Sequence, residues 1–343
     1  MNNFWKGKKV LITGHTGFKG SWLALVLKFY GAELYGISDK KMKGIFTDIK
    51  LSNLYKEEKL FSILDIDNLR KFINNIQPEI VFHFAAQSLV PLAYQKPKET
   101  LEINSLGTFN ILEVSNQTKS IRSLILATTD KVYKNTNLWN KEVDELGGNE
   151  FYSISKVLAE NIIEGFKNQY SRDNLYFTVI RSGNVIGGGD RGESRLLTDL
   201  LNSVKNGNDL EIRNPKSIRP WQDILDSVNG YINAAKYCFL QEKSEIFNLS
   251  SKENNEYTIE YLISKFIESW GSNIKINIIN NNKFVETQEL RLDSSKAKSI
   301  LNWEPKVKLE ESINKIVDWE KSNIKGEANK ITEIQIKQFF EKL

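Results

Sequence analysis

One segment near the start of the chain joins a short apolar run to a helical run through three glycines. Lys9–Thr13 reads KVLIT, Ser21–Tyr30 reads SWLALVLKFY, and between them Gly14, Gly17 and Gly20 recur every third residue. Glycines between a first strand and a first helix permit a tight turn, and they let the backbone approach a pyrophosphate at the positive end of the helix. The segment therefore predicts a dinucleotide-binding α/β fold, with a mere tight turn as the alternative.

The rest of the chain continues this alternation of apolar runs and amphipathic stretches. Further strands are predicted at 33–37, 79–84, 122–128, 176–181 and 245–249, and helices at 66–75, 98–119, 156–170, 194–205 and 223–239. Near-continuous apolar strands that alternate with helices indicate a parallel sheet covered on both faces. The expected fold class is α/β, a Rossmann-type doubly wound parallel sheet with a smaller, interleaved C-terminal α/β substrate lobe.

The pattern also suggests how the chain is divided. We expect residues 1–182 to form the nucleotide-binding domain, with 222–252 returning to it. Residues 183–221 and 253–343 would form the smaller lobe, because their segments are short and rich in Lys, Asn and Glu. The last stretch, 330–343, is charged, and we expect a solvated terminal helix there.

The composition excludes several kinds of chemistry. Among 343 residues there is one cysteine, Cys238, and there are two histidines, His15 and His83. A lone cysteine forms no internal disulfide, which favours a reducing, cytoplasmic setting, and a Cys/His zinc site needs three or four such ligands. We therefore expect no metal site, and proton transfer through Tyr, Lys, Asp or Glu.

The charge and hydropathy patterns narrow the range of partners. The chain carries 47 basic and 43 acidic residues, a net charge of +4. That excess is too small to indicate nucleic-acid binding, and it would suit an anionic small molecule. No stretch approaches the roughly 18 apolar residues of a membrane span. We expect neither a nucleic-acid nor a membrane partner.

Two segments carry the residue types of acid–base catalysis. Thr129, Asp130 and Lys131 follow the fourth predicted strand, and Tyr152 and Lys156 open a helix four residues apart. Ligands of open parallel sheets bind beyond the carboxyl ends of the strands, where both segments are expected. An ammonium on the same helix face would lower the phenol pKa from about 10 and make Tyr152 a general base. The alternatives are a surface Tyr–Lys pair and an aspartate that only caps a loop.

These segments together resemble the extended short-chain dehydrogenase/reductase family, and within it the sugar-nucleotide 4,6-dehydratases. The similar pieces are TGHTGFKGSW (13–22), PEIVFHFAAQSLV (78–90), TTDKVY (128–133), LGG (146–148), YSISK (152–156), RSGNVIGGGD (181–190), RPWQ (219–222) and LDSSKAKSILNWEP (292–305). The pair Asp130–Lys131 resembles the dehydratases that act on CDP-glucose. The dTDP-glucose and GDP-mannose types tend to carry Asp-Glu or a lone Glu there.

The resemblance implies NAD as the cofactor, and Asp39 after the second strand would favour NAD over NADP. The residues that it implies for NAD binding are Gly14, Thr16, Gly17, Phe18, Lys19, Gly20, Ser38, Asp65, Ile66, Ala85, Ala86, Gln87, Asn104, Tyr152 and Lys156. For the substrate it implies Asn184, Arg195, Arg219 and Trp221. An Arg fork suits phosphate oxygens, although a surface salt bridge is the plain alternative for each arginine and packing for the tryptophan.

The resemblance also implies a reaction. Tyr152 takes the proton of the sugar 4-hydroxyl, which Thr129 hydrogen-bonds, while C4 passes a hydride to NAD⁺. Water then leaves across C5 and C6, with Asp130 protonating the 6-hydroxyl and Lys131 as the candidate partner for the C5 proton. Hydride returns to C6 and gives a 4-keto-6-deoxy sugar nucleotide.

Other functions remain as alternatives: an epimerase or reductase on the same fold, a dehydratase of another nucleotide sugar, or an NAD-binding sensor. Pro91, Asp223 and Arg191–Gly192 stand where the family has Arg, His and Trp-Ala, which leaves the hexose and the nucleotide open. The family resemblance further implies a homodimer or a dimer of dimers, paired through the helix of Tyr152 and its neighbour at 98–117.

Overall fold

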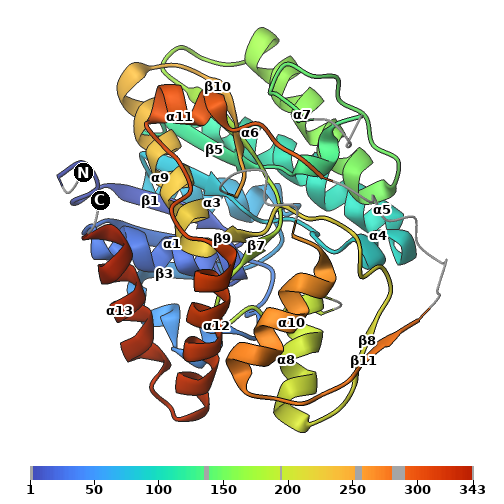
Figure 1. Cartoon of the computed structure of the whole chain (residues 1–343). Helices are drawn as coiled ribbons and strands as arrows, with labels where there is room; N and C mark the ends of the chain where they lie inside the picture. Colours follow the sequence, from blue (N-terminus) through green and yellow to red (C-terminus); the bar gives the residue numbers. More distant parts are fainter. Residues whose placement is uncertain (1–2, 135–138, 194, 252–256, 280–289, 342–343) are drawn as a thin grey trace.

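A seven-stranded parallel sheet forms the centre of the computed structural model, which describes residues 3–134, 139–193, 195–251, 257–279 and 290–341 (Figure 1). The strand order is β10-β6-β5-β4-β1-β2-β3. The strands are β1 (Lys9–Thr13), β2 (Glu33–Ser38), β3 (Tyr55–Leu60), β4 (Ile80–His83), β5 (Ser123–Ala127), β6 (Tyr176–Ser182) and β10 (Glu245–Leu249). The order reverses between β1 and β4, which makes a crevice for ligands at their carboxyl ends. The expected Rossmann-type fold is confirmed.

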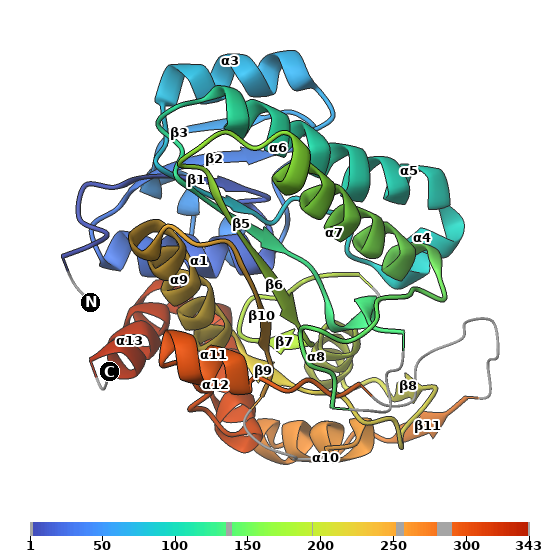
Figure 2. The ribbon, with the colours of Figure 1, turned by 90° about the horizontal axis from the view of Figure 1, so that it is seen from above.

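Helices cover both faces of this sheet, which is why its central strands are largely apolar. Val10 and Ile12 pack into the core beneath α1 and α9, whereas Leu11 between them packs into the core beneath α3, α6 and α7 (Figure 2). The bounds are α1 (Phe18–Phe29), α3 (Ile66–Ile76), α6 (Gly107–Gln117), α7 (Phe151–Gln169) and α9 (Ile224–Gln241). Successive side chains of β1 point to opposite faces of the sheet and therefore pack into two separate cores.

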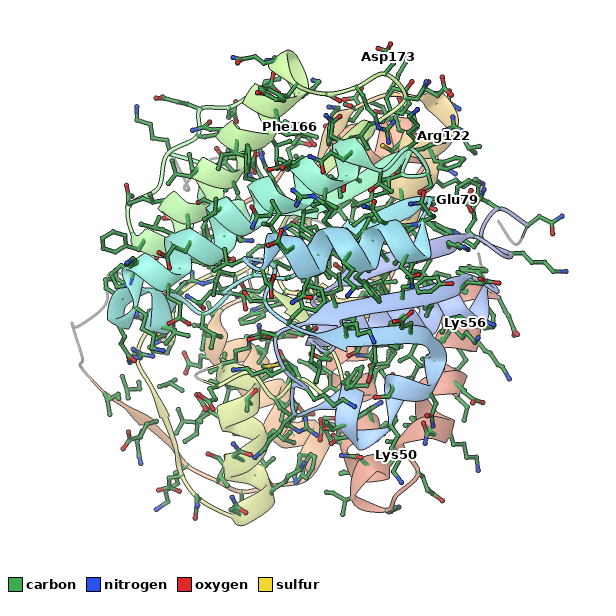
Figure 3. The ribbon with its side chains drawn as sticks, turned by 180° about the vertical axis from the view of Figure 1, so that it is seen from behind. Lys50, Lys56, Glu79, Arg122, Phe166 and Asp173 are labelled. Atoms are coloured by element: carbon green, nitrogen blue, oxygen red, sulfur yellow. The ribbon has the colours of Figure 1, made fainter. Side chains whose placement is uncertain are left out.

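The amino ends of the strands lie at the opposite end of the sheet from the glycine turn. Glu79, Arg122 and Asp173 gather there, just before β4, β5 and β6, and Lys56 lies near the start of β3 (Figure 3). Glu79 forms an ion pair with Lys8, and Arg122 forms one with Glu242. Ion pairs close this end, so the functional residues must be sought at the other.

The edge strand β3 is not predicted by the sequence. Four of its six residues, YKEEKL, are charged, so apolar side chains do not alternate along it. Its hydrogen-bonding partner is β2. Charged side chains on an edge strand prevent pairing with other chains. The same charges hide the strand from a hydrophobicity pattern.

A smaller core lies beside the carboxyl ends of the strands, built by α8, α10, α12 and two short strand pairs. Its elements are β7 (Val185–Ile186), α8 (Leu196–Asn206), β8 (Leu210–Ile212), β9 (Gln222–Asp223), α10 (Ile259–Trp270), β11 (Ile276–Ile278) and α12 (Leu309–Ile324). Of the expected lobe, residues 194, 253–256, 280–289 and 342–343 lie outside the described residues.

The C-terminal helix α13 (Ala328–Phe340) is not the solvated helix that its charges suggest. Phe339 and Phe340 are buried in the core of α1, and Trp319 Nε1 donates to Thr332 Oγ1 at 2.8 Å. The helix therefore packs on α1 and α12, with its charged residues outward. Within the described ranges, no helix combines the length and apolar composition needed to cross a bilayer.

Candidate active site

The glycine turn between β1 and α1 is shaped by close backbone contacts. Gly14 has a φ of +72°, and a Cβ placed there would lie 2.6 Å from Ala85 N. Gly17 is the N-cap of α1, which has no side-chain cap and no acidic residue in its first turn. An uncapped helix N-terminus behind a side-chain-free turn is suited to an anion. The residues present therefore fit the pyrophosphate of a dinucleotide.

The end of β2 connects to this turn through buried polar groups. Ser38 Oγ accepts from Thr16 N at 3.2 Å and lies 3.0 Å from His15 Nδ1, and His15 Nε2 lies 3.1 Å from Glu58 Oε2. Burial lowers the His15 pKa, with Glu58 opposing it. Ser38 and Thr16 thus lie together beside the turn.

Two residues implied for NAD binding, Asp65 and Ile66, lie at the start of α3. Asp65 is the exposed N-cap of that helix, and its carboxylate accepts from Asn68 N at 3.1 Å and from Asn68 Nδ2 at 2.6 Å. These hydrogen bonds lower the Asp65 pKa. Ile66 is partly buried and packs against the core of α3. The structure gives Asp65 a capping role.

The loop after β4 is held by an amide from an irregular helical turn. The helix expected at 98–119 contains a π-helical turn, η2 (Glu102–Leu106), between α5 (Pro97–Leu101) and α6. There Asn104 Oδ1 accepts from Gln87 N at 2.8 Å, and Asn104 Nδ2 donates to Gln87 O and to Ser155 Oγ. Each polar atom of this amide is engaged. Asn104 therefore positions the 85–87 loop.

The strand β5 leads into Asp130, one of whose carboxylate oxygens has no partner among the described residues. Thr129 Oγ1 donates to Asp130 Oδ1 at 2.9 Å, and Lys131 Nζ lies 3.3 Å from the same oxygen. Asp130 is 2% exposed, and its Oδ2 has no hydrogen-bond partner among the described residues. A buried, unpaired oxygen is costly and marks where a substrate hydroxyl can bind.

Tyr152 and Lys156 face this acid from the first turns of α7. Burial raises the Tyr152 pKa to about 12, and a hydrogen bond with Thr129 opposes the rise. Burial also lowers the Lys156 pKa to about 8, and Lys156 Nζ donates to Ala127 O at 3.3 Å. The Tyr152 pKa is therefore raised, and not lowered as expected from Lys156, because desolvation prevails.

Lys19 brings a further cation from the glycine turn to the catalytic cluster. Its Nζ donates to Ser182 Oγ at 2.9 Å and lies 5.9 Å from the Tyr231 ring centroid. Burial, and secondarily Arg195, lower the Lys19 pKa to about 7. Lys19, Lys131, Lys156 and Arg195 are thus brought close to one another and to Asp130, and this group of cations, partly balanced by Asp130, Asp190 and Glu160, suits an anionic ligand.

The residues implied for the substrate differ in their placement. Arg195 Nη1 pairs with Asp190 Oδ2 at 2.7 Å, and Nη2 reaches Ser88 Oγ at 3.4 Å. Arg195 therefore bridges two loops above the cluster. Arg219 is buried and donates to Ile218 O, whereas Trp221 packs in the smaller core, with no partner for its Nε1 among the described residues.

The remaining substrate residue, Asn184, contributes its backbone. Asn184 O accepts from Gln222 N at 2.8 Å, so it joins β7 to β9 next to the site. The nearby Gly183 packs against Pro220, and a Cβ there would lie 3.4 Å from Asp130 Oδ2. Asn184 is thus brought to the edge of the acid's pocket.

Sequence reasoning missed three charged residues that support the cluster. Glu150 caps α7, accepting from Tyr152 N and Ser153 N at 2.7 Å each, and Glu160 forms a buried pair with Arg181. The spacing of Glu150 and Ser153 is a capping signal that could have been read. The Glu160–Arg181 pair has no comparable signal, because its members meet only in the folded chain.

The chain matches the family model of GDP-mannose 4,6 dehydratase over residues 11–316. It is 39% identical over 337 residues to the CDP-glucose 4,6-dehydratase of Salmonella typhimurium LT2, covering 95% of this chain and 94% of that protein. It is also 25% identical, with a TM-score of 0.82, to a UDP-glucose 4-epimerase of Thermotoga maritima solved with UDP-glucose, covering 92% and 99% of the two chains.

A dTDP-glucose 4,6-dehydratase of Bacillus anthracis, solved in complex with NAD, shares the fold. Its TM-score is 0.78 at 20% identity, and the match covers 93% of this chain and 98% of that one. The similarity in sequence and in fold extends over both cores, so it includes the segments that build the site.

Proposed function

Because this chain belongs to the GDP-mannose 4,6-dehydratase family, we propose that the cluster around Asp130 carries out the 4,6-dehydration of CDP-glucose. The protein is an NAD-dependent nucleotide-sugar 4,6-dehydratase, a hydro-lyase. Its product is CDP-4-keto-6-deoxyglucose, formed by C4 oxidation, loss of water across C5 and C6, and hydride return to C6.

The Asp130 carboxylate is the observation that carries this proposal. An epimerase needs the Tyr–Lys pair and a hydroxyl, whereas loss of a hydroxyl as water needs a further acid. Asp130 supplies one directly beside Thr129, buried, with one oxygen unpaired. The neighbouring Lys131 gives the Asp-Lys pair that resembles the CDP-glucose branch.

Each side chain has a role that its position allows. NAD, which the glycine turn would hold, would supply the hydride acceptor for C4 and the hydride donor for C6. Tyr152 accepts the proton of the sugar 4-hydroxyl, and Thr129, which hydrogen-bonds Tyr152, holds the same hydroxyl. The 4-ketone acidifies the C5 hydrogen. With the proton of the Asp130–Lys131 pair on Asp130, that acid protonates the departing 6-hydroxyl, and the neutral Lys131 receives the C5 proton and returns it to C5 as hydride reaches C6.

The anionic part of the substrate accounts for the surrounding cations. Arg195 sits between the 85–88 loop and the Asp190 loop, and its charge acts on both Lys19 and Tyr152. A guanidinium in that place suits the diphosphate of a nucleotide sugar. Arg219 would contribute from the loop before β9.

The setting and assembly belong to the same proposal. Cys238 is free and buried, which favours a reducing cytoplasm. Exposed apolar side chains lie on adjacent helices of one face, with Leu106 and Phe109 on the η2–α6 stretch and Phe151 and Leu158 on α7. Such a patch suits a homodimer.

The test is incubation of the purified protein with NAD⁺ and, separately, CDP-, dTDP-, GDP- and UDP-glucose and GDP-mannose. We expect mass spectrometry to show loss of one water from CDP-glucose, with no net accumulation of NADH. An isomer of unchanged mass would indicate an epimerase, and accumulating NADH would indicate a dehydrogenase. Water loss from another nucleotide sugar alone would overturn the CDP-glucose assignment while retaining the reaction.

A further inference from the structure

Glu160 extends the catalytic face of α7 by one more turn. It follows Lys156 by four residues, so both lie on one side of the helix, and its side chain is 4% exposed. A buried carboxylate must be paired and hydrogen-bonded. Arg181 on β6 provides this: its Nε lies 3.1 Å from Glu160 Oε1 and 3.0 Å from Oε2, and its Nη2 pairs with Oε2.

The carboxylate also holds the strand that carries the acid. Thr128 Oγ1 donates to Glu160 Oε1 at 2.7 Å, and one residue earlier Ala127 O accepts from Lys156 Nζ. Two successive residues at the end of β5 are therefore attached to α7, immediately before Thr129.

The arginine holds the other end of the same segment. Arg181 Nη1 donates to Tyr133 OH at 2.9 Å, and Tyr133 OH donates to Asn248 Oδ1 at 2.7 Å on β10. The short turn that carries Asp130 thus has Glu160 attached before it, at Thr128, and Arg181 attached after it, at Tyr133.

We propose that Glu160 and Arg181 form a positioning pair, which fixes the Asp130 turn against the helix that carries Tyr152 and Lys156. Neither residue touches the reacting atoms; the pair acts by holding the acid and the base in register. This inference rests on the proposed function, because it takes the relative position of Asp130 and Tyr152 to matter for the dehydration step. Near-attack geometry is sensitive to displacements of about 1 Å, which cost on the order of 100-fold in rate.

The pair also has an electrostatic consequence for Lys156. The titratable and charged groups that face Lys156 are Lys19 from α1, His83 from β4, and Tyr152 and Glu160 on α7 itself. Burial lowers the Lys156 pKa, and Glu160 opposes that change. Removing the Glu160 charge would lower the pKa further, so the protonated form of Lys156 would be lost at a lower pH.

Glu160→Gln tests the pair because it keeps the shape and an acceptor for Thr128. We expect kcat to fall roughly ten- to hundred-fold with KM within about threefold, and the basic limb of the kcat–pH profile to move to lower pH. Glu160→Asp, which retains the charge, should return that limb toward its original position. An unchanged pH profile in Glu160→Gln would overturn the electrostatic part of the proposal.

Stability effects are separated by two further variants. Glu160→Gln leaves Arg181 charged and unpaired, whereas Glu160→Gln/Arg181→Gln removes both charges and should recover much of the thermal stability without restoring kcat. Glu320→Gln is the matched control, since Glu320 is buried and paired with Arg191 on another part of the fold. A double variant with restored kcat, or a Glu320 variant with the same shifted profile, would contradict a positioning role.

A readout without substrate distinguishes this inference from the proposed function. Hydrogen exchange followed by mass spectrometry should show faster exchange of residues 123–133 in Glu160→Gln, by about tenfold or more, and unchanged exchange there in Glu320→Gln. If no nucleotide sugar is turned over but this exchange result holds, the dehydratase assignment fails and the register role of the pair stands. Unchanged exchange in Glu160→Gln would sink the register role whatever the activity.

Discussion

The two oxygens of the Asp130 carboxylate are in different situations. Oδ1 accepts from Thr129, whereas Oδ2 is buried without a partner among the described residues. Asp130→Asn keeps the acceptor and the shape but cannot give up a proton. We expect water loss, measured by mass spectrometry of the product, to slow by about 10²- to 10³-fold.

The charge of Asp130 also raises the Tyr152 pKa. In Asp130→Asn that pKa should fall, so C4 oxidation should persist while dehydration stalls, and NADH absorbance should rise after substrate is added. Glu145→Gln is the control, because Glu145 is an exposed carboxylate paired with Lys134. Dehydration at the original rate in Asp130→Asn would assign the acid elsewhere.

His83 couples the stability of the chain to pH. Its Nδ1 lies 2.7 Å from Thr13 Oγ1 and its Nε2 3.3 Å from Thr108 Oγ1, which suits a neutral ring. Burial, and secondarily Lys156, lower the His83 pKa to about 3. Between pH 3 and 6.5 the unfolded chain therefore binds a proton that the folded chain does not.

Stability accordingly rises with pH across that window, by up to about 5 kcal/mol from this group, and the gain is lost as the pH falls from 6.5 toward 3. His83→Asn should flatten the dependence by one proton in urea unfolding followed by circular dichroism. Thr108→Val keeps the titrating ring and should keep the slope. A slope that is equal in all three proteins would show that His83 is not the linked group.

At the scale of elements, the glycine turn can be tested against a second glycine with the same backbone strain. Gly14 and Gly207 have φ values of +72° and +68°, but a Cβ at Gly14 would collide with Ala85 N, whereas one at Gly207 meets nothing within 4 Å. Gly14→Ala should abolish NAD⁺ binding measured by calorimetry. Gly207→Ala should cost about 1 kcal/mol of stability and leave the affinity unchanged. Equal affinities would mean that the turn does not hold the cofactor.

Elements with a strong local signal could be predicted from the sequence, and those defined by a neighbour could not. The buried strands β1 and β4 are continuous apolar runs. By contrast, β3 is charged and becomes a strand through pairing with β2. In the sequence of α13, charged residues are interspersed with the apolar ones. Its apolar face is recognised only from its packing on α1.

The site divides in the same way. Thr129, Asp130, Tyr152 and Lys156 are readable because their spacing places reactive groups at the end of one strand and on one helix face. Their pKa values are not readable, because burial in the folded chain dominates them. The pairing of Arg181 with Glu160 is not readable either, because the two residues are 21 positions apart in sequence and meet only in the folded chain.

At the scale of the whole molecule, the modest net charge of +4 does not show where the charges lie. Lys19, Lys131, Lys156 and Arg195 come close to Asp130 at the carboxyl ends of the strands, although Arg195 also pairs with Asp190 and Glu160 acts on Lys156. At the amino ends, Lys8 and Arg122 are paired with glutamates. Cations from separate elements thus converge at the carboxyl ends. An anionic substrate is thereby attracted toward the end of the sheet where the acid and the base lie.

The apolar face of α6 and α7 gives the last prediction. Single exposed apolar residues are ordinary on a monomer, but Leu106, Phe109 and Leu158 lie on helices that contact each other. Light scattering after gel filtration should give twice the 39.5 kDa mass of the chain. Phe109→Asp/Leu158→Asp should give the monomer mass and a lower Tm, because burying like charges across a symmetric interface is costly.

Leu240→Asp, at an exposed position near the end of α9, should remain dimeric. A wild-type chain that is monomeric at tens of micromolar would refute the dimer. Because α7 also carries Tyr152 and Lys156, a dimer built on this face would stiffen the catalytic helix, so the double variant should also lose kcat.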